Sequence, residues 1–322
     1  MSGSRRLHRV WIDRPAPGVE IPGDVELCDG PTGADAVIVG SGESWDAAAC
    51  RRLPRLKIVA RPGIGYENVD VAGCAANGVA VCNAPDAPTV STAEHTLALI
   101  LAVAKRLKAA ERRLRGARDD LRGLRERGAL ELDGRTLGLV GCGRIGSRVG
   151  RYAEALGMRV ATFDPHIGAA PVGEAVELEQ LWQTADVVSL HAPATPETRH
   201  IVDARSLAAM RPGAVLVNCA RGSLVDHDAL VAALESGPLA GAGLDVTDPE
   251  PLPPDHPLLA RDDVIVTPHV ASTTTVGHIR LVTAALTEAL RWLRGGIPEH
   301  LLDADAAHPA VDRRLRAGEA AP

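Results

Sequence analysis

The stretch "LGLVGCGRIGSRVG", residues 137–150, places three glycines directly after a short apolar run. Gly141, Gly143 and Gly146 follow the pattern Gly-x-Gly-x-x-Gly. The apolar residues before them are predicted to form a strand, and the residues after them have the periodicity of a helix. Glycines in this pattern between a strand and a helix are typical of a dinucleotide-binding turn. The alternative is a glycine-rich corner with a purely structural role.

Each glycine has its own physical reason in such a turn. Gly141 permits the tight turn, Gly143 lets the backbone approach a pyrophosphate, and Gly146 lets the helix pack closely, while the helix N-terminus faces the anion. The next strand ends at Asp164, 18 residues after Gly146. A carboxylate there accepts hydrogen bonds from both ribose hydroxyls and repels a 2′-phosphate. No arginine follows Asp164 directly, so the sequence favours NAD over NADP.

Short β-branched runs alternate with longer Ala- and Leu-rich periodic segments, which predicts α/β units on parallel sheets. A chain of 322 residues is long for one core, so two α/β halves are expected. The prolines of "NAPDAP", residues 83–88, indicate a hinge between them. Strands are expected at residues 10–13, 36–39, 57–60 and 79–81 in the first half, and at 136–140, 159–163, 187–190, 214–218, 243–246 and 264–267 in the second. Helices are expected at 44–52, 69–77, 91–114 and 274–293, after the glycine turn as far as Gly157, and from Asp226 to a C′ glycine at Gly237.

Composition excludes several classes of protein. A net charge of −6 disfavours a general nucleic-acid binder. No apolar stretch approaches the ~18 residues of a membrane span, and no apolar segment of a signal peptide follows the N-terminal basic residues. The six cysteines include no C-x-x-C pair, which fits a reducing, cytoplasmic compartment. Residues 105–127 carry ten Lys/Arg against four Asp/Glu and are expected to be a solvated helix face, with a partner-binding surface as the alternative.

Three polar residues follow apolar strands in the second half: Arg221 in "VNCARG", Glu250 in "DVTDPEP" and His269 in "VTPHVAS". Ligands of open α/β sheets bind outside the carboxyl ends of the strands. An arginine there can hold a carboxylate in a bidentate manner, and a histidine oriented by a carboxylate can move a proton to or from an alcohol. The three together suit the oxidation of a 2-hydroxy acid. Each one alone has a plainer interpretation as a solvated or capping residue.

From about residue 57 to about residue 293 the chain resembles the D-isomer-specific 2-hydroxyacid dehydrogenases, a family that includes D-3-phosphoglycerate dehydrogenase, hydroxypyruvate/glyoxylate reductase and D-lactate dehydrogenase. The resemblance rests on a series of motifs in the family's order: "ARPGIGYENVDVAGCAANGVAVCNAP" (60–85), "STAEHTLALILAVAKR" (91–106), "GRTLGLVGCGRIG" (134–146), "LHAPATPETRHIV" (190–202), "VLVNCARGSLVDHDAL" (215–230), "AGAGLDVTDPEPLPPDHPL" (240–258) and "TPHVAS" (267–272). Several long motifs in this order are highly specific.

The resemblance implies a role for each catalytic candidate. His269 is expected to be the general acid/base at the C2 oxygen, held by Glu250, and Arg221 to bind the substrate carboxylate. Substrate contacts are expected from the loop that contains Arg61, Gly63, Ile64 and Gly65, where Arg61 has a structural role as its alternative. Cofactor contacts are expected from Thr92, Gly141, Gly143, Arg144, Ile145, Gly146, Asp164, His191, Ala192, Cys219, Ala220, Asp245, His269 and Ala271, with Asp245 near the nicotinamide amide. No metal ligand is expected.

The resemblance also implies the architecture. Residues 1–86 and 273–322 are expected to form a discontinuous, flavodoxin-like substrate domain, and residues 87–272 an NAD-binding Rossmann domain, with the active-site cleft between the two. A small anionic 2-hydroxy or 2-oxo acid is the expected substrate, such as 3-phosphoglycerate, glycerate or glycolate. A homodimer through the NAD domain is expected, with neither nucleic acid nor membrane as a partner. Because the chain ends near the last helix, a short form without regulatory C-terminal domains is expected.

Three departures from the family's pattern put the substrate pocket and subunit contacts in doubt. Thr247 stands where an aromatic residue is usual, Pro62 where a small residue is common, and residues 115–133 lack a tryptophan often found there. Two other functions stay open. One is oxidation of a phosphonate or phosphite analogue, and the other is an NAD-sensing binding protein like the family's transcriptional corepressors. No G-x-S-x-G elbow of a triad hydrolase is present.

Overall fold

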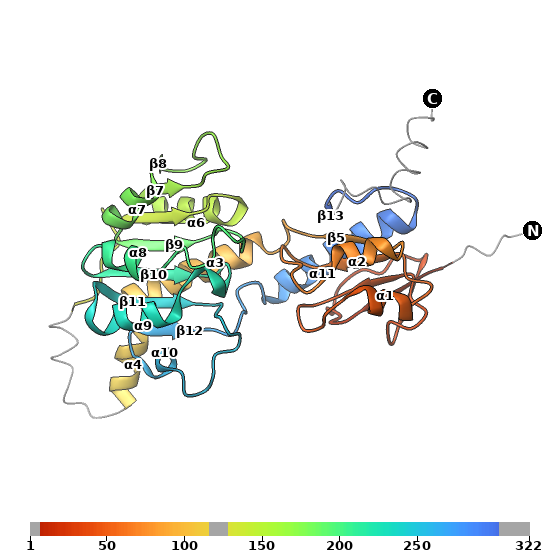
Figure 1. Cartoon of the computed structure of the whole chain (residues 1–322), viewed down its shortest axis with the longest axis horizontal. Coiled ribbons are helices and arrows are strands. Elements are labelled where there is room, and N and C mark those ends of the chain that lie inside the picture. Colours follow the sequence, from red (N-terminus) through yellow and green to blue (C-terminus); the bar gives the residue numbers. More distant parts are fainter. Residues whose placement is uncertain (1–6, 116–127, 303–322) are drawn as a thin grey trace, which may run out of the picture. The chain divides into compact units, whose positions relative to one another are not determined.

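The computed structural model describes residues 7–115 and 128–302. These residues divide into two compact units, which Figure 1 shows and which are described one at a time. Unit 1 contains the residues up to 88 and from 274 onward, and unit 2 contains residues 89–273. The expected boundaries stood at residues 86/87 and 272/273. The cleft expected between the two halves stays a prediction.

Unit 1 is built on a six-stranded sheet with the strand order β13-β5-β4-β3-β1-β2. The bounds of the strands are β1 His8–Ile12, β2 Val25–Cys28, β3 Ala36–Ile38, β4 Ile58–Arg61, β5 Ala80–Asn83 and β13 Leu301–Leu302. All pairs are parallel except β13 with β5. The order 2-1-3-4-5 of the first five strands is that of flavodoxin-like folds.

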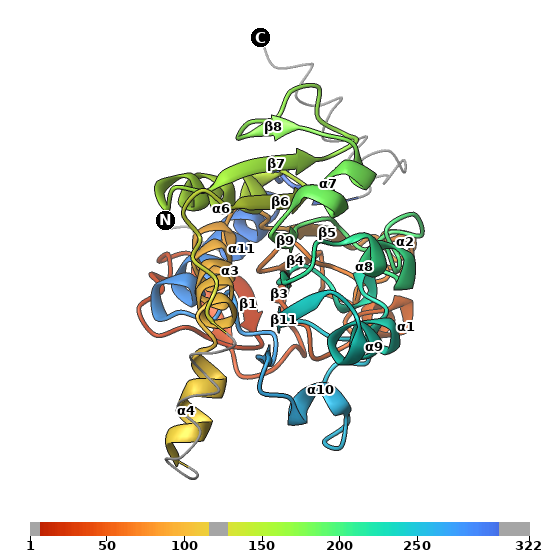
Figure 2. The same ribbon diagram turned by 90° about the vertical axis from the view of Figure 1, so that its left-hand side faces the viewer.

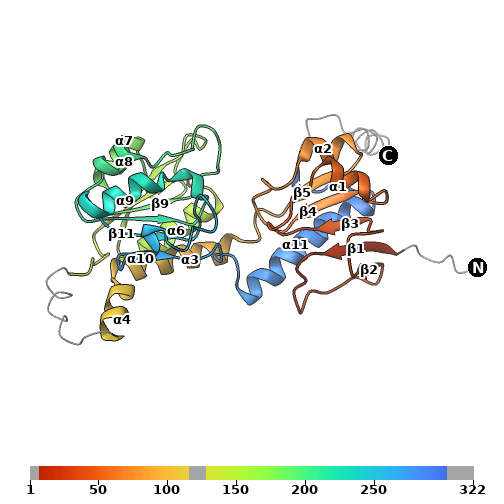
Figure 3. The ribbon, with the colours of Figure 1, turned by 60° about the horizontal axis from the view of Figure 1, so that its bottom comes forward.

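Helices cover both faces of this sheet. α11 (Thr275–Leu293) packs on one face, and α1 (Ala47–Arg52) and α2 (Val71–Ala76) pack on the other, as Figure 3 shows. Within β3 and just past it the side chains alternate: Ala36 and Ile38 belong to the core under α11, and Val37 and Val39 to the core under α1 and α2. Since both of its faces are buried, β3 is apolar at every position.

Unit 2 is built on a seven-stranded parallel sheet with the order β12-β11-β10-β9-β6-β7-β8. The bounds are β6 Thr136–Val140, β7 Arg159–Phe163, β8 Glu174–Ala175, β9 Val187–Leu190, β10 Ala214–Asn218, β11 Leu239–Leu244 and β12 Val264–Val266. The first strand of the unit, β6, lies between β7 and β9. Numbered along the chain, the order is 3-2-1-4-5-6-7, which is the Rossmann order 3-2-1-4-5-6 with a seventh strand added at one edge. The direction of winding reverses between β6 and β9, where ligands bind in doubly wound sheets.

Two helix layers enclose the unit 2 sheet (Figure 2). One core lies under α3 (Thr89–Ala104) and α6 (Arg144–Ala155), and the other lies under α7 (Leu178–Thr184), α8 (Ala204–Ala209) and α9 (His227–Ser236). The short elements η2 (Gly222–Leu224) and α10 (Pro257–Ala260) follow β10 and β11. The predicted fold class, two doubly wound α/β units, is confirmed.

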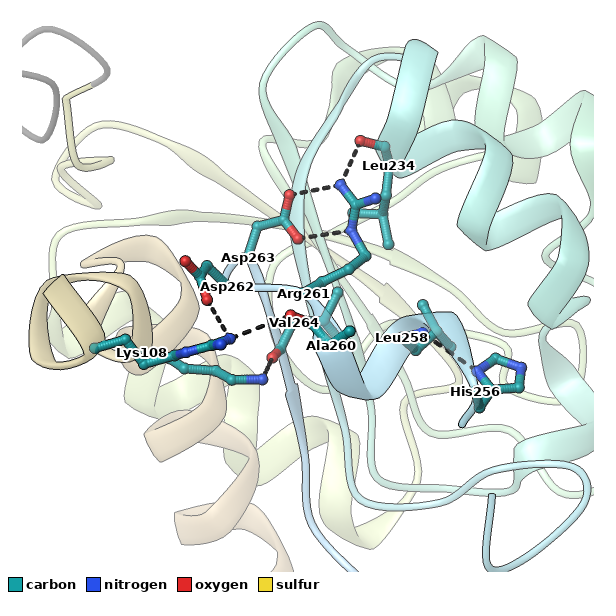
Figure 4. A network of polar contacts seen from close by, with 10 residues as sticks. Lys108, Leu234, His256, Leu258, Ala260, Arg261, Asp262, Asp263 and Val264 are labelled. Atoms are coloured by element: carbon teal, nitrogen blue, oxygen red, sulfur yellow. Dashed lines mark hydrogen bonds and ion pairs between the residues drawn. The ribbon is translucent and has the colours of Figure 1, made fainter. Parts of the chain in front are cut away.

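The long helix expected over residues 91–114 is wrong in one respect, because the structure breaks it in two. α3 ends at Ala104, Arg106 has a left-handed φ of 55°, and α4 (Leu107–Arg115) begins after it. Lys108 Nζ donates to Val264 O at 2.7 Å, and Arg112 pairs with Asp262. Figure 4 shows this network at the edge formed by α10 and β12. These two basic residues are therefore bound to the protein and do not merely contact solvent. Most of the remaining basic stretch, residues 116–127, lies outside the described residues.

Glycines explain two other differences from the prediction. α9 ends before Gly237 as expected, but Gly237 is its C-cap in an extended conformation, with φ −95° and ψ −164°, and not a C′ glycine. A β-carbon there would lie 2.7 Å from the Ala233 Cα atom, so glycine is needed for a close approach. β11 begins at Leu239 instead of the expected residue 243. Gly241 and Gly243 interrupt the apolar pattern, so the sequence did not predict the first part of this strand. A β-carbon on Gly243 would lie 3.0 Å from the Leu99 Cβ atom of α3.

In the described residues, no helix is long and apolar enough to cross a bilayer.

Candidate active site and dinucleotide site

The glycine turn has the geometry that the sequence predicts. Gly141 has a φ of 91°, and a β-carbon on it would lie 2.7 Å from the carbonyl carbon of His191. A β-carbon on Gly146 would lie 2.3 Å from the carbonyl oxygen of Gly141. A β-carbon on Gly143 would meet no atom within 4 Å. The chain's own packing therefore requires Gly141 and Gly146, whereas the space beside Gly143 is free of protein atoms, as the expected approach of a pyrophosphate requires.

The N-terminus of α6 adds an electrostatic attraction for an anion. Gly143 is the N-cap of this helix, and no side chain caps it. The first backbone N–H groups of a helix have no partner within the helix, and the helix dipole favours negative charge there. Backbone donors and a side-chain-free N-cap together form the kind of site that binds phosphate groups.

Asp164 ties the end of β7 to the glycine turn. Its Oδ2 accepts from the backbone N–H of Cys142 at 2.8 Å, and its Oδ1 accepts from the N–H of His166 at 2.9 Å. A carboxylate has about four acceptor positions, so it retains capacity for a ribose hydroxyl. These bonds fix an anionic group beside the turn, which supports the selection of NAD against a 2′-phosphate.

His191 follows β9 on the other side of the point where the winding reverses. Its Nε2 pairs with Ser189 Oγ at 2.9 Å, and burial lowers the pKa of the imidazole to about 4. The ring is therefore neutral near pH 7. Cys219, directly after β10, is 8% exposed, and its burial raises the pKa of its thiol to about 12. Of the other expected cofactor residues, Thr92 and Ala271 are buried, Ile145, Ala192 and Ala220 are partly buried, and Arg144 is exposed.

The structure brings Glu250 and His269 into direct contact. Glu250 Oε1 lies 2.7 Å from His269 Nδ1, and both side chains are about two-fifths exposed, at 41% and 43%. Because a carboxylate accepts, Nδ1 carries the hydrogen, and Nε2 is the nitrogen left for a substrate oxygen. His269 has a φ of 53°, a left-handed conformation that is uncommon outside glycine and often marks functional sites.

Arg221 follows β10, the strand next to the one that precedes Glu250. Its Nη1 donates to Ala220 O at 2.7 Å. The buried Asn218 side chain orders this turn, since its Nδ2 donates to Arg221 O at 2.8 Å and its Oδ1 accepts from Ala220 N at 3.0 Å. β10, β11 and β12 are adjacent, so Arg221, Glu250 and His269 come from neighbouring loops at one sheet edge.

Asp245 has structural contacts within unit 2, and the nicotinamide contact that the resemblance implies stays a prediction. Its side chain is 1% exposed, and it accepts from Thr267 Oγ1 at 2.6 Å and from the N–H groups of Val270 and Ala271, each at 2.9 Å. Burial raises the pKa of Asp245, but these hydrogen bonds and one from His95 outweigh it and hold the pKa below its ordinary value. Asp245 is thus an ionised acceptor that shapes the loop of His269.

In unit 1 the expected substrate loop has its carbonyl groups turned inward. Gly63 O accepts from Ala84 N at 3.1 Å, Ile64 O accepts from Asn83 Nδ2 at 2.8 Å, and Gly65 O accepts from Arg61 Nε at 2.9 Å. In a trans peptide the N–H group points opposite to the carbonyl group. The next N–H group after each carbonyl therefore faces away from the body of the unit.

Arg61 itself is buried, at 8% exposure. Besides Gly65 O, its guanidinium donates to Val39 O at the end of the neighbouring strand. These contacts support the structural alternative for Arg61, in which it holds the loop in place. Thr247, the residue that departs from the family's pattern, is also turned inward, because its Oγ1 donates to Pro249 O at 2.8 Å.

Sequence reasoning missed the residues that support the site. Asn218 lies in the motif at residues 215–230, directly before the loop of Arg221. A polar amide at the end of an apolar strand could have indicated a residue that orders this loop. His95 is 172 positions away from its partner Thr267, and nothing in the chain order pairs them. In the described residues, no three His, Cys, Asp or Glu side chains are grouped to hold a metal ion.

The site defines a class of protein: a dinucleotide-binding α/β protein with a histidine–carboxylate pair at the same sheet edge. The family model of the NAD-binding domain of D-isomer specific 2-hydroxyacid dehydrogenases matches residues 97–271, which lie within unit 2. The chain belongs to this family, and unit 2 is its NAD-binding domain.

Relatives support the same assignment. The glyoxylate reductase of Korarchaeum cryptofilum is 35% identical over 304 residues, covering 91% of this chain and 89% of its own. The D-3-phosphoglycerate dehydrogenase of Methanocaldococcus jannaschii is 37% identical over 300 residues, covering 88% of this chain but 56% of its own. The chain therefore spans only about half the length of that relative.

Solved structures agree with the fold. The TT0316 protein of Thermus thermophilus has a TM-score of 0.81 and 38% identity, covering 91% of this chain and 99% of its own. The D-lactate dehydrogenase of Aquifex aeolicus, solved with NAD and lactic acid, has a TM-score of 0.76 and 28% identity, covering 91% and 98%.

Proposed function

We propose that this protein is an NAD-dependent D-2-hydroxyacid dehydrogenase, or 2-oxoacid reductase, acting on a small anionic substrate such as 3-phosphoglycerate, glycerate or glycolate. The observation that carries the proposal is the 2.7 Å contact between Glu250 and His269, on the same sheet as the glycine turn. The names of the relatives, D-3-phosphoglycerate dehydrogenase and glyoxylate reductase, support this class of substrates.

The chain's own residues account for the proton and the charge. His269 Nε2 donates a proton to the C2 oxygen in reduction and accepts it in oxidation, while Glu250 fixes the ring through Nδ1 and balances the imidazolium charge. Arg221 pairs with the substrate carboxylate through its planar guanidinium. NAD supplies or accepts the hydride at C2 when it is bound.

The turned-out N–H groups of the unit 1 loop are suited to binding a carboxylate. Three consecutive backbone donors, of Ile64, Gly65 and Tyr66, have their paired carbonyls fixed by the protein. Donors held in place in this way cost little reorganisation when an anion binds. We therefore assign substrate recognition to the main chain of this loop and not to the Arg61 side chain.

Steady-state kinetics test the proposal directly. NADH oxidation would be measured with glyoxylate, hydroxypyruvate, phosphohydroxypyruvate and phosphonopyruvate, using the wild type and His269→Ala. We expect turnover with at least one 2-oxo acid and a loss of about 10²- to 10⁴-fold in kcat for the variant. Tight NADH binding without turnover of any 2-oxo acid would refute the enzyme and favour an NAD-sensing protein. Turnover of phosphonopyruvate alone would move the substrate class to phosphonates.

We also propose that the chain forms a homodimer through unit 2 in the cytoplasm. α4 exposes Leu107 and Leu114, at 55% and 66%, and exposed leucines on one helix favour a protein interface. All six cysteines are free thiols, which suits a reducing compartment. Light scattering of the purified protein tests the dimer, because a monomer at micromolar concentration would contradict it.

A further inference from the structure

His95 on α3 contacts the loop of His269 from a distant part of the sequence. Its Nε2 lies 3.0 Å from Thr267 Oγ1 and 3.4 Å from Asp245 Oδ1. Thr267 Oγ1 in turn lies 2.6 Å from the same carboxylate oxygen. The three side chains therefore form one cluster, and all of them belong to unit 2.

The positions of the hydrogens in this cluster follow from chemistry. Asp245 is ionised and can only accept, so the single hydroxyl proton of Thr267 is donated to it. The Thr267 oxygen is then left only as an acceptor toward His95. The Nε2 atom of His95 must therefore carry a hydrogen, which it donates toward Thr267.

The cluster holds the backbone on which His269 stands. The Asp245 carboxylate accepts from the N–H groups of Val270 and Ala271, and the Asp245 carbonyl accepts from the N–H of His269 at 2.7 Å. Asp245 thus binds the three residues 269–271, and His95 and Thr267 fix Asp245. These contacts hold His269 in its left-handed conformation, which is unfavourable for a residue other than glycine.

The position of the cluster in the chain adds a second reason for its importance. The chain passes between the units at residues 88/89 and 273/274. His95 lies in the second turn of α3, just after the first passage, and residues 267–271 lie just before the second. The hydrogen bond between His95 and Thr267 therefore links the beginning of α3 to the loop that precedes residue 273, and both belong to unit 2.

We propose that His95 is a positioning residue, which acts through Thr267 and Asp245 to hold His269 in its working conformation. The inference rests on the proposed function of His269 as the acid/base. His95 contacts neither substrate nor cofactor in this role. Its contribution is the Nε2–H donor, so a side chain that supplies a donor at the same place serves equally well.

Two variants separate the donor from mere bulk. His95→Leu keeps the volume and removes the donor, whereas His95→Gln places an amide N–H near the former Nε2. We expect His95→Leu to lower kcat about tenfold, because one hydrogen bond to a charged cluster is lost and the acid/base shifts. We expect KM for the 2-oxo acid and Kd for NADH to stay within about twofold of the wild type, and His95→Gln to recover most of kcat. Glu94→Leu, at an exposed position on the same helix, is the matched control and should keep full activity.

Crystal structures of the wild type, His95→Leu and His95→Gln make the test independent of turnover. We expect the 2.7 Å contact between Glu250 and His269 to be lost or lengthened in His95→Leu and retained in His95→Gln. Wild-type kcat together with an unmoved His269 in His95→Leu would overturn the inference, as would equal losses in both variants. If the wild type reduces no 2-oxo acid, the proposed function fails, and the crystal structures alone decide whether His95 positions the loop.

Discussion

Gly143 is the glycine of the turn that the protein does not need for its own packing, and replacing it tests this distinction. A methyl group at Gly143 meets no protein atom within 4 Å, whereas a methyl group at Gly146 lies 2.3 Å from the Gly141 carbonyl oxygen. Gly143→Ala therefore costs the fold only the N-cap preference, under about 1 kcal/mol. Gly146→Ala forces backbone atoms apart and is expected to cost about 1–3 kcal/mol or more.

Gly143→Ala is expected to weaken NADH binding, because the added methyl group would occupy space that the cofactor needs. Overpacking a close contact costs about 1–3 kcal/mol, and each 1.4 kcal/mol is about tenfold in affinity. Gly143→Ala should therefore raise the Kd for NADH by roughly 5- to 150-fold, with a melting temperature only about 2–4 °C lower. Fluorescence titration measures the first quantity and thermal denaturation the second. An unchanged Kd, or a loss of stability as large as that of Gly146→Ala, would refute the reasoning.

Three further outcomes are expected. Asp164→Ala should raise the preference for NADPH over NADH by about tenfold or more, since repulsion of the 2′-phosphate is lost; the ratio of kcat/KM with the two cofactors measures it. Burial lowers the pKa of His191 in the folded protein to about 4 from 6.5, so the unfolded chain binds more protons between these two pH values. The free energy of unfolding should therefore fall as the pH falls through this range. Urea titrations of the wild type should show this dependence on pH, and His191→Asn should lack the contribution of His191. Arg61→Ala should destabilise unit 1 by about 1–3 kcal/mol, because buried carbonyl acceptors lose a charged donor, and Arg61→Lys should not restore it in the same thermal assay.

The sequence was sufficient for the features that local chemistry determines. The strand–turn–helix around Gly141, the strand end at Asp164 and the period of the buried strands each depend on residues close together in the chain. The rule that ligands bind at the carboxyl ends of parallel strands placed Arg221, Glu250 and His269 at one sheet edge, and the family resemblance implied the contact of Glu250 with His269. The comparison with the family pattern then distinguished these residues from solvated ones.

The sequence was insufficient where a distant partner changes the role of a residue. Asp245 matched a cofactor position, and the sequence did not show that its carboxylate also accepts hydrogen bonds from groups that lie 22 to 26 positions further on. The break at Arg106 was missed because the residues around it are good helix formers, and contacts of α4 with the β12 edge determine where the second helix begins. Gly237 matched a helix-ending pattern, but the physical reason for glycine there is that a β-carbon would collide with the backbone of Ala233.

The inward carbonyls of the loop at residues 63–65 have a consequence for how substrate preference evolves. A carboxylate contact made by main-chain N–H groups is indifferent to the identity of the side chains, so mutation cannot easily remove it. Ile64 and Tyr66, both about two-fifths exposed at 39% and 42%, are free to vary beside it. Under the function proposed above, substitutions of these two side chains would change which 2-oxo acid binds, while the main chain would keep its contact with the acid group.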